Sequence, residues 1–259
     1  MFGKNPIRDN ETHLDGSTLA VQEVFYTLQG EGPYSGRPAT FIRLAGCNLA
    51  CHFCDTEFES GMSNRVPILD IVQQVVTSRI RDFVVLTGGE PMRQNIVPLI
   101  KALLDAGVQL VQIETAGTLW VPELDLFIMR NRGVELVCSP KTPSIHPRII
   151  EWCLHWKYVI EHGKVDPDDG LPIMGMQTRN IEMRQRIWRP WMSRNLAWWQ
   201  SMGGSLGTIW VSPCDAHESE RFELVPGEPT SRNVEAAVQS AMQYGYRLSL
   251  QTHKIVRLP

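Results

Sequence analysis

The chain has few cysteines, no long apolar run and little net charge. No apolar run reaches the ~18 residues that a membrane-spanning helix requires. Residues 1–16 are polar and lack the apolar core of a secretory signal. A net charge of −3 gives no general basic surface for nucleic acid. We therefore expect a cytoplasmic protein without membrane or direct nucleic-acid partners, whose clustered thiols serve metal binding or catalysis rather than disulfides.

The sequence also lacks internal repeats and low-complexity tracts, and its composition is ordinary for a globular protein. What recurs is a set of nearly continuous apolar runs, typical of parallel strands buried on both faces. The predicted strands span residues 39–46, 82–89, 108–115, 134–140, 156–162, 208–213 and 246–253. Apolar residues at helical spacing predict helices within 68–80, 96–104 and 234–241. This alternation predicts an α/β fold with a mainly parallel, curved or barrel-like sheet.

We predict a mobile tail at residues 1–19 and a single domain at 20–259. The alternating pattern breaks at about 164–206, which we interpret as an insertion rich in tryptophan and arginine. One interpretation of this insertion is a flap that covers the barrel. The other is a docking surface for an acidic, flavodoxin-type electron donor. Its arginines are Arg179, Arg184, Arg186, Arg189 and Arg194.

Three of the six cysteines lie within the stretch AGCNLACHFCDTEF, residues 45–58. Cys47, Cys51 and Cys54 have C-x3-C-x2-C spacing, which fits the paired cysteines of a structural zinc site poorly. A 4Fe–4S cluster held by three thiolates leaves one iron open to a substrate or cofactor. Three buried cysteines with a purely structural role are the alternative.

A glycine-rich segment, TGGEP at 87–91, ends the second predicted strand. Gly88 and Gly89 would let backbone carbonyls approach a cation, and Glu90 would add negative charge. Ligands of α/β proteins gather at the carboxyl ends of strands, so this segment is a candidate binding site. In isolation, the tetrapeptide GGEP could form an ordinary turn.

The cysteine motif directly after one strand, with GGEP after the next, resembles the signature of the radical S-adenosylmethionine superfamily. The flanking segments VFYTLQGEGPYSGRPATFIRLAGCN, CDTEF, QIETAGT, CSPK, WKYVI and QTHK are similar to those of 7-carboxy-7-deazaguanine synthases. This resemblance covers roughly residues 20–163 and 206–259.

The resemblance implies an incomplete, modified TIM-like barrel. It implies a carbon–nitrogen lyase that converts 6-carboxy-5,6,7,8-tetrahydropterin to 7-carboxy-7-deazaguanine with ring contraction and loss of ammonia. A 4Fe–4S cluster, S-adenosylmethionine and Mg²⁺ are the implied cofactors, and a homodimer is the implied assembly. Queuosine biosynthesis, a secondary metabolite and modified DNA all stay open as the destination of the product.

The resemblance also assigns residues to roles. Cys47, Cys51 and Cys54 would hold the cluster, and the hydroxyl of Thr56 would bind Mg²⁺. The implied cofactor-binding residues are Phe53, Gly88, Gly89, Glu90, Glu114, Ser139, Pro140, Lys141, Ser212, Pro213, Cys214 and Asp215. The implied substrate-binding residues are Leu28, Gln29, Gly30, Arg43, Thr87, His253 and Pro259.

Two of these assignments have a specific chemical reason and a specific alternative. Arg43 can form a bidentate pair with a substrate carboxylate, or it can form a salt bridge at the end of a strand. The carboxylate of Pro259 offers two acceptors that match the N–H groups of a pterin. The alternative is a frayed chain end that binds no substrate, since most chain ends are poorly ordered.

Two other functions stay open. Another radical S-adenosylmethionine enzyme, such as a glycyl-radical activase, would share the cysteine motif and GGEP but would not need TLQGEG or Arg43. A non-catalytic zinc- or cluster-binding scaffold would need the cysteines alone.

Overall fold

The computed structural model describes residues 5–128, 133–173, 186–192, 208–215 and 231–258. The strands among them are β1 (Thr18–Leu28), β2 (Pro38–Leu44), β3 (Arg65–Pro67), β4 (Phe83–Gly88), β5 (Leu110–Thr115), β6 (Val134–Cys138), β7 (His155–Ile160), β8 (Ile209–Pro213) and β9 (Arg247–Leu248). The helices are α1 (Ile68–Thr77), α2 (Val97–Asp105), α3 (Asp125–Ile128), α4 (Pro147–Trp152), α6 (Arg232–Tyr244) and α7 (Thr252–Ile255). Short 3-10 helices are η1 (Gly32–Tyr34), η2 (Ser60–Ser63), η3 (Pro91–Arg93) and η4 (Pro190–Met192).

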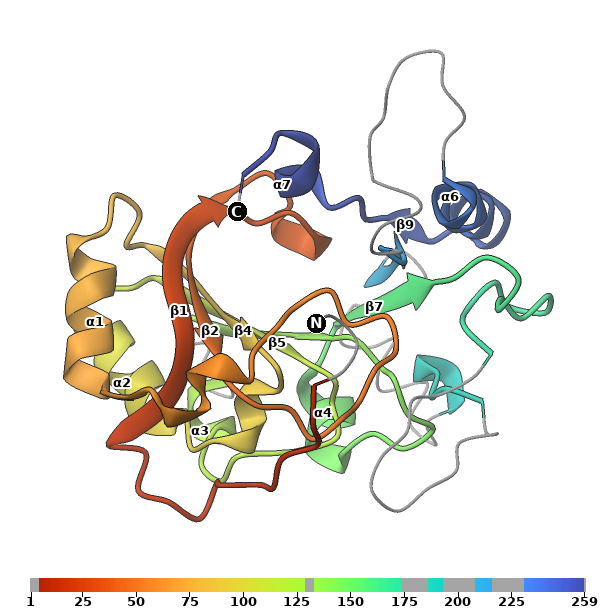
Figure 1. Cartoon of the computed structure of the whole chain (residues 1–259). Coiled ribbons are helices and arrows are strands. Elements are labelled where there is room, and N and C mark those ends of the chain that lie inside the picture. The colour runs from red at the N-terminus through yellow and green to blue at the C-terminus, as the bar shows by residue number, and fades with distance from the viewer. Residues whose placement is uncertain (1–4, 129–132, 174–185, 193–207, 216–230, 259) are drawn as a thin grey trace.

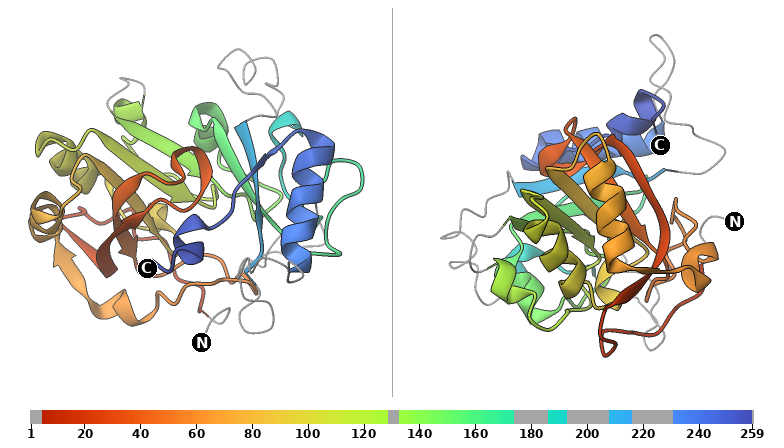
Figure 2. Two further views of the ribbon diagram at one scale, coloured as in Figure 1. Left: turned by 90° about the horizontal axis from the view of Figure 1, so that it is seen from above. Right: turned by 90° about the vertical axis from the view of Figure 1, so that its left-hand side faces the viewer.

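One sheet contains all of these strands, in the order β3-β1-β2-β4-β5-β6-β7-β8-β9. The strands from β2 to β9 run parallel, whereas β1 is antiparallel to both β2 and β3. Within the described residues, β3 and β9 are the two edges of the sheet and do not pair with each other. The curved sheet therefore forms an open barrel with helices outside it (Figures 1 and 2). The predicted incomplete, modified TIM-like barrel is confirmed.

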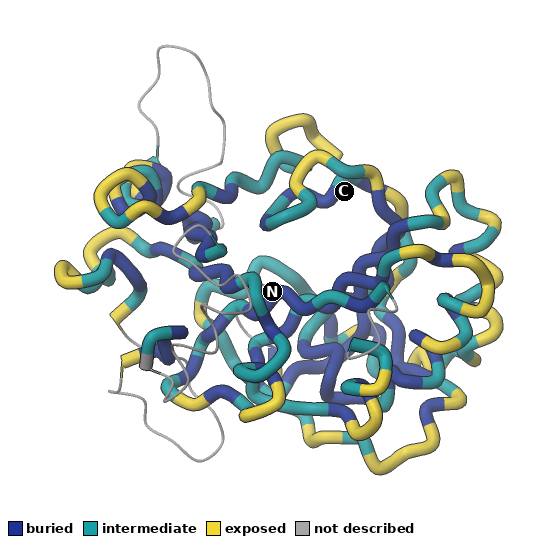
Figure 3. Tube along the Cα trace, turned by 180° about the vertical axis from the view of Figure 1, so that it is seen from behind, coloured by how far each residue is buried: buried dark blue, intermediate teal, exposed yellow. Residues whose placement is uncertain are grey.

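The parallel strands are buried because helices cover the outer face of the sheet (Figure 3). Phe83–Leu86 of β4 are fully buried, as expected for a continuous apolar run. Helix α6 packs on β8 and ends at Gly245, whose φ of +76° suits a residue without a Cβ atom. No helix in the described ranges is long and apolar enough to cross a membrane.

The predicted strands are confirmed for β2 and for β4 through β8. Strand β1 was not predicted, because its polar and half-exposed positions interrupt the apolar run. The predicted strand at 246–253 is wrong over most of its length, since only β9 pairs with β8 there. The chain then turns into α7, where the Thr252 amide donates to the Gly30 carbonyl at 3.1 Å. That contact joins residues far apart in sequence, so local periodicity could not reveal it.

Contrary to the predicted mobile tail, residues 5–17 pack against the barrel. The Arg8 amide donates to the Cys47 carbonyl at 2.7 Å. The side chain of Arg93 is fully buried and donates to Glu11 at 2.7 Å. This segment thus supplies hydrogen-bond acceptors to a buried guanidinium. A polar sequence alone does not distinguish residues with such a role from residues that only contact water.

Much of the insertion falls outside the described residues, including Arg179, Arg184 and Arg194. Arg189 is fully buried, and its Nε lies 2.9 Å from Asp169. Arg186 pairs with Asp166 and lies 3.3 Å from Asp169. Arg189 is therefore structural, and including it in a free docking surface was wrong. The side chain of Arg186 is 42% exposed, so a docking role for this residue stays a prediction.

We expect Glu11→Gln to lower the free energy of unfolding by about 1.5–3 kcal/mol, because Arg93 would lose its charged partner. Burial raises the pKa of Glu11, but hydrogen bonds from Arg93 and Arg65 outweigh it and lower this pKa. The ionised carboxylate thus stabilises the fold above its ordinary pKa of 4.5 and loses this effect as the pH falls through the lowered value. Urea unfolding should show a difference between the two proteins that shrinks on acidification.

Asp105→Asn is the matched control. The Lys101–Asp105 pair on α2 has both side chains 66% exposed, so its removal should change stability by less than about 0.5 kcal/mol. Equal losses for the two variants would contradict the role given to Glu11.

Candidate active site

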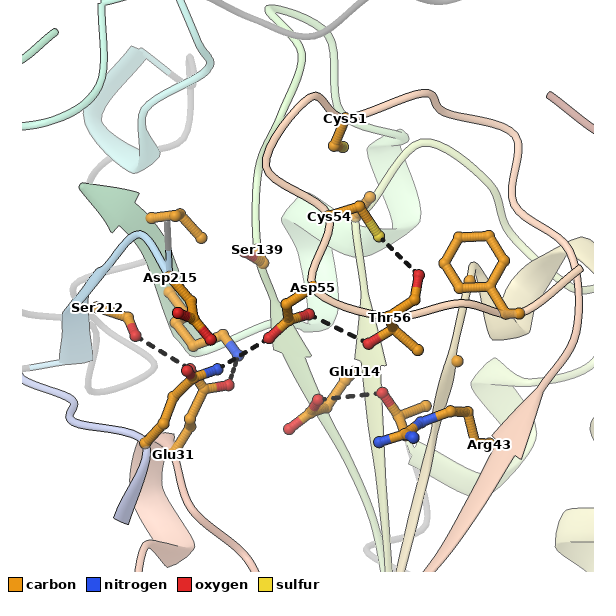
Figure 4. A pocket seen from close by; sticks show the side chains of 18 of the residues that line it. Glu31, Arg43, Cys51, Cys54, Asp55, Thr56, Glu114, Ser139, Ser212 and Asp215 are labelled. Carbon is orange, nitrogen blue, oxygen red and sulfur yellow. Dashed lines mark hydrogen bonds and ion pairs between the residues drawn. The ribbon is translucent and has the colours of Figure 1, made fainter. Parts of the chain in front are cut away.

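A pocket lies at the carboxyl ends of the parallel strands, with residues 45–58, here called the cysteine loop, in its wall (Figure 4). This loop follows β2 and leads to η2. Thr87 comes from β4, Glu114 from β5 and Ser212 from β8. Residues from distant parts of the sequence therefore face one space.

The structure brings most of the predicted site residues together. Those that line the pocket are Leu28, Gln29, Arg43, Cys47, Cys51, Phe53, Cys54, Thr56, Thr87, Gly88, Gly89, Glu114, Ser139, Lys141, Ser212, Pro213, Asp215 and His253. Gly30, Glu90, Pro140 and Cys214 do not line it. Pro259 lies outside the described residues.

The three cysteines of the cysteine loop line the pocket and form no disulfides. The Leu49 amide donates to the Cys47 sulfur at 3.4 Å. Burial raises the pKa of the Cys47 thiol and raises that of Cys51 to about 11. In the described part of the chain, no group of three or more His, Cys, Asp or Glu side chains is already arranged to hold a metal ion.

The end of β4 fits closely beneath this loop. A Cβ atom on Gly89 would lie 2.1 Å from the Gly46 carbonyl oxygen and 2.9 Å from the Cβ of Cys47. Gly89 is therefore required for packing, in addition to any contact it makes with a cofactor.

Glu90 differs from its predicted role. Its carboxylate is fully buried and accepts hydrogen bonds from the Met92 amide at 3.0 Å, the Thr115 hydroxyl at 2.8 Å and the Ala116 amide at 2.8 Å. Burial outweighs these bonds and raises the pKa of Glu90. Glu90 thus joins the ends of β4 and β5 instead of presenting charge to the pocket.

An ion pair that the sequence analysis missed spans another wall of the pocket. The carboxylate of Glu31 pairs with the ammonium of Lys157 and accepts from the Ser212 hydroxyl at 3.0 Å. Burial opposes both charges, yet Lys157 lowers the pKa of Glu31 and Glu31 raises the pKa of Lys157. Both residues stand in motifs that carried the resemblance, LQGEG and WKYVI. Their place in these motifs was the signal that could have identified them as site residues.

Glu114 and Arg43 line the pocket with their own partners in place. The Glu114 carboxylate accepts from Gln29 at 3.0 Å and from the Thr87 hydroxyl at 3.2 Å. Arg43 pairs with Glu23, so the alternative predicted for it, a strand-end salt bridge, is present. Its guanidinium still faces the pocket, where it could also meet a ligand carboxylate.

His253 lies against the loop after β1. A Cβ atom on Gly30 would fall 1.8 Å from the Nδ1 of His253, so only glycine admits the imidazole there. This Nδ1 is buried and has no hydrogen-bond partner among the described residues. Burial lowers the pKa of His253, which favours a neutral ring.

Asp55 and Thr56 follow the last cysteine and contact the C-terminal segment. The Thr56 hydroxyl donates to Asp55 Oδ1 at 3.1 Å, and Lys254 lies 3.0 Å from Asp55 Oδ2. Burial opposes ionisation, but Lys254 and its hydrogen bond hold the pKa of Asp55 well below its usual range. Sequence analysis missed Asp55 and Lys254, although CDTEF and QTHK contain them.

The chain matches named relatives over its whole length. It is 42% identical over 261 residues, covering 100% of both chains, to the 7-carboxy-7-deazaguanine synthase of Rhodospirillum rubrum. It is 34% identical to that of Rickettsia prowazekii, covering 99% of this chain and 95% of the relative. The chain belongs to the 7-carboxy-7-deazaguanine synthase family. The resemblance inferred from the sequence motifs is thereby confirmed.

No family model matches the chain. Among solved structures, QueE from Escherichia coli matches with a TM-score of 0.54, covering 91% of this chain and 94% of that one. At 20% identity this match concerns the fold, which is the same open α/β barrel.

The N-terminal segment contributes a residue that no motif indicated. Asn5 is buried beside the cysteine loop. Its Nδ2 donates to the Thr56 carbonyl at 2.9 Å and to the Cys54 sulfur at 3.8 Å. Its Oδ1 accepts from the Phe58 amide at 3.5 Å. One side chain thus links three residues of the loop to the N-terminal segment.

Asn5→Ala should lower the free energy of unfolding by about 1–2 kcal/mol, because buried backbone groups of the loop lose their partners. The control is Asn10→Ala, whose side chain is exposed and bonds only to the nearby Thr12 amide. Chemical unfolding of both variants measures the difference. Equal stability would mean that residue 5 behaves as part of a mobile tail.

Proposed function

We propose that the chain is a radical S-adenosylmethionine enzyme that converts 6-carboxy-5,6,7,8-tetrahydropterin to 7-carboxy-7-deazaguanine. Ring contraction and loss of ammonia would make it a carbon–nitrogen lyase. The observation that carries the proposal is family membership over the full length of both chains. The pocket supports it, because thiols, strand ends and hydrogen-bonding side chains face one space.

Cys47, Cys51 and Cys54 would hold the 4Fe–4S cluster. The donor set fits, since thiolates are the usual ligands of such clusters and all three cysteines line the same pocket. Their raised pKa values mean that binding of iron must release protons. When bound, the cluster and S-adenosylmethionine supply the one-electron chemistry that starts the reaction.

The side of the pocket near β6 would bind S-adenosylmethionine. Lys141 donates to the Ser139 hydroxyl at 2.7 Å, and its ammonium lies 6.0 Å from the centre of the Phe53 ring. Polar and aromatic surfaces beside the cysteines suit a cofactor that has both a charged and a ring portion. The other predicted cofactor contacts in the pocket come from the ends of β4, β5 and β8.

Gln29, Arg43, Thr87 and His253 would bind the substrate. Arg43 offers its guanidinium to the carboxylate, and His253 lines the same pocket. These residues exclude water and hold the reacting carbon in place, which is the protein's share of a cofactor-driven reaction.

Thr56 would bind Mg²⁺. Because Asp55 accepts the hydroxyl proton of Thr56, the lone pairs of that oxygen remain available to a hard cation. Mg²⁺ takes few protein ligands and keeps most of its waters, so the substrate carboxylate could complete the site. When bound, the ion would place positive charge beside that carboxylate.

The test is mass spectrometry of the products after anaerobic incubation with 6-carboxytetrahydropterin, S-adenosylmethionine, Mg²⁺ and a reductant. We expect 7-carboxy-7-deazaguanine and ammonia. A protein with an intact, reducible cluster that forms neither product would refute the substrate. A colourless preparation that holds zinc would instead support the scaffold alternative.

The cluster ligands have a separate test. Cys47→Ala, Cys51→Ala and Cys54→Ala should each abolish cluster assembly and cofactor cleavage, measured as iron content and electron paramagnetic resonance of the reduced protein. Cys153→Ala is the control, because Cys153 is fully buried outside the pocket and its thiol donates to the His155 carbonyl at 3.1 Å. Loss of iron in this control would show that the ligand assignment is wrong.

The remaining proposals concern the cellular setting. We propose a cytoplasmic homodimer that receives electrons from a flavodoxin-type protein and supplies queuosine biosynthesis. Family membership supports the 7-deazapurine product. The homodimer rests on the resemblance alone, and the acidic donor rests on the arginine-rich composition of the insertion.

A further inference from the structure

Lys254 joins two carboxylates that come from distant parts of the chain. Its ammonium lies 3.0 Å from Asp55 Oδ2, in the cysteine loop 199 positions away. The same ammonium lies 2.5 Å from Asp215 Oδ2, at the end of β8. The three side chains are only 20–33% exposed, so solvent screens their attraction less than it would at an open surface.

Polar contacts account for the position of α7. This helix has four residues, too few to be stable alone. Gln251 donates to Asp55 Oδ2 at 3.3 Å, and the Thr252 amide donates to the Gly30 carbonyl at 3.1 Å. None of the residues of α7 is buried, so apolar packing contributes little. The helix is therefore held by bonds to three separate segments: the loop after β1, the cysteine loop and the end of β8.

The two oxygens of Asp55 have different partners. Oδ2 faces Lys254 and Gln251, whereas Oδ1 accepts the hydroxyl proton of Thr56. Since a carboxylate is rigid and planar, fixing one oxygen fixes the direction of the other. Lys254 thus orients Thr56 through Asp55, in the manner of residues that support a ligand from behind.

The same helix carries His253 immediately before Lys254. The imidazole fits against Gly30 with almost no spare room, as the 1.8 Å approach of a built Cβ atom indicates. A small displacement of α7 would therefore move His253 away from the pocket.

We propose that Lys254 is a positioning residue that clamps α7 to the cysteine loop and to β8. The clamp holds His253 against Gly30 on one side of the pocket and orients Thr56 on the other. It deepens the proposed function, and it rests on that function for the identity of the ligands that His253 and Thr56 would meet.

Hydrogen–deuterium exchange of the reconstituted full chain, without substrate, tests the clamp. In Lys254→Met, amides of α7 and of the cysteine loop after Cys54 should exchange about tenfold faster, because a charge-assisted contact of each segment is lost. Lys254→Arg should restore much of the protection, since a guanidinium can also reach two carboxylates. Lys101→Met is the control, because it removes an ammonium from an exposed pair on α2.

Asp215→Asn separates the two halves of the clamp. It removes the bond to β8 and leaves Asp55 paired, so exchange should rise in α7 more than in the cysteine loop. This variant and Lys254→Arg keep the proposal testable even where Lys254→Met folds poorly. Unchanged exchange in both segments of Lys254→Met, or equal changes in Lys101→Met, would overturn it.

Kinetics give a second readout. Lys254→Met should raise KM more than it lowers kcat, because the thiols and the ends of β4, β5 and β6 make no contact with Lys254. A change confined to kcat would contradict positioning of the substrate. The exchange experiment needs no turnover. A wild-type protein that forms no deazapurine would therefore refute the proposed function and leave the clamp to be judged by exchange alone.

Discussion

The parallel strands from β2 to β9 end at the same rim of the barrel, and the pocket depends on this constraint. In a parallel sheet every strand is followed by a return connection, so strands far apart in sequence present their carboxyl ends together. Thr87, Glu114 and Ser212 meet for this reason. The antiparallel β1 ends beside the amino end of β2, and the loop after it brings Glu31 into the pocket from that side.

Polar contacts hold the loops above that rim. Glu31 is tied to Lys157 of β7, and the cysteine loop is tied on one side to Asn5 and on the other to Lys254. Such contacts are directional and are strengthened by partial shielding from water. They leave the pocket with charges of both signs facing the space where ligands would bind.

The TGGEP motif illustrates how far a motif can be interpreted without the structure. Its place at a strand end beside the cysteine loop was correctly predicted, because the motif and the strand are contiguous in sequence. The burial of Glu90 was not predicted, since its partners Thr115 and Ala116 lie at the end of the next strand and just after it. Nor did the sequence indicate that residue 89 must be glycine. A Cβ atom added there would lie 2.1 Å from the Gly46 carbonyl oxygen.

The sequence by itself determined the α/β class, most of the parallel strands and the spacing of the three thiols, because periodicity and motif spacing are properties of contiguous residues. It also carried enough similarity to indicate the family. Only the tertiary structure decided that residues 5–17 pack down, that Glu31 pairs with a lysine 126 positions away, and that Lys254 joins two distant carboxylates. Which charges meet depends on distances across the fold, and the separation of residues along the chain does not contain those distances.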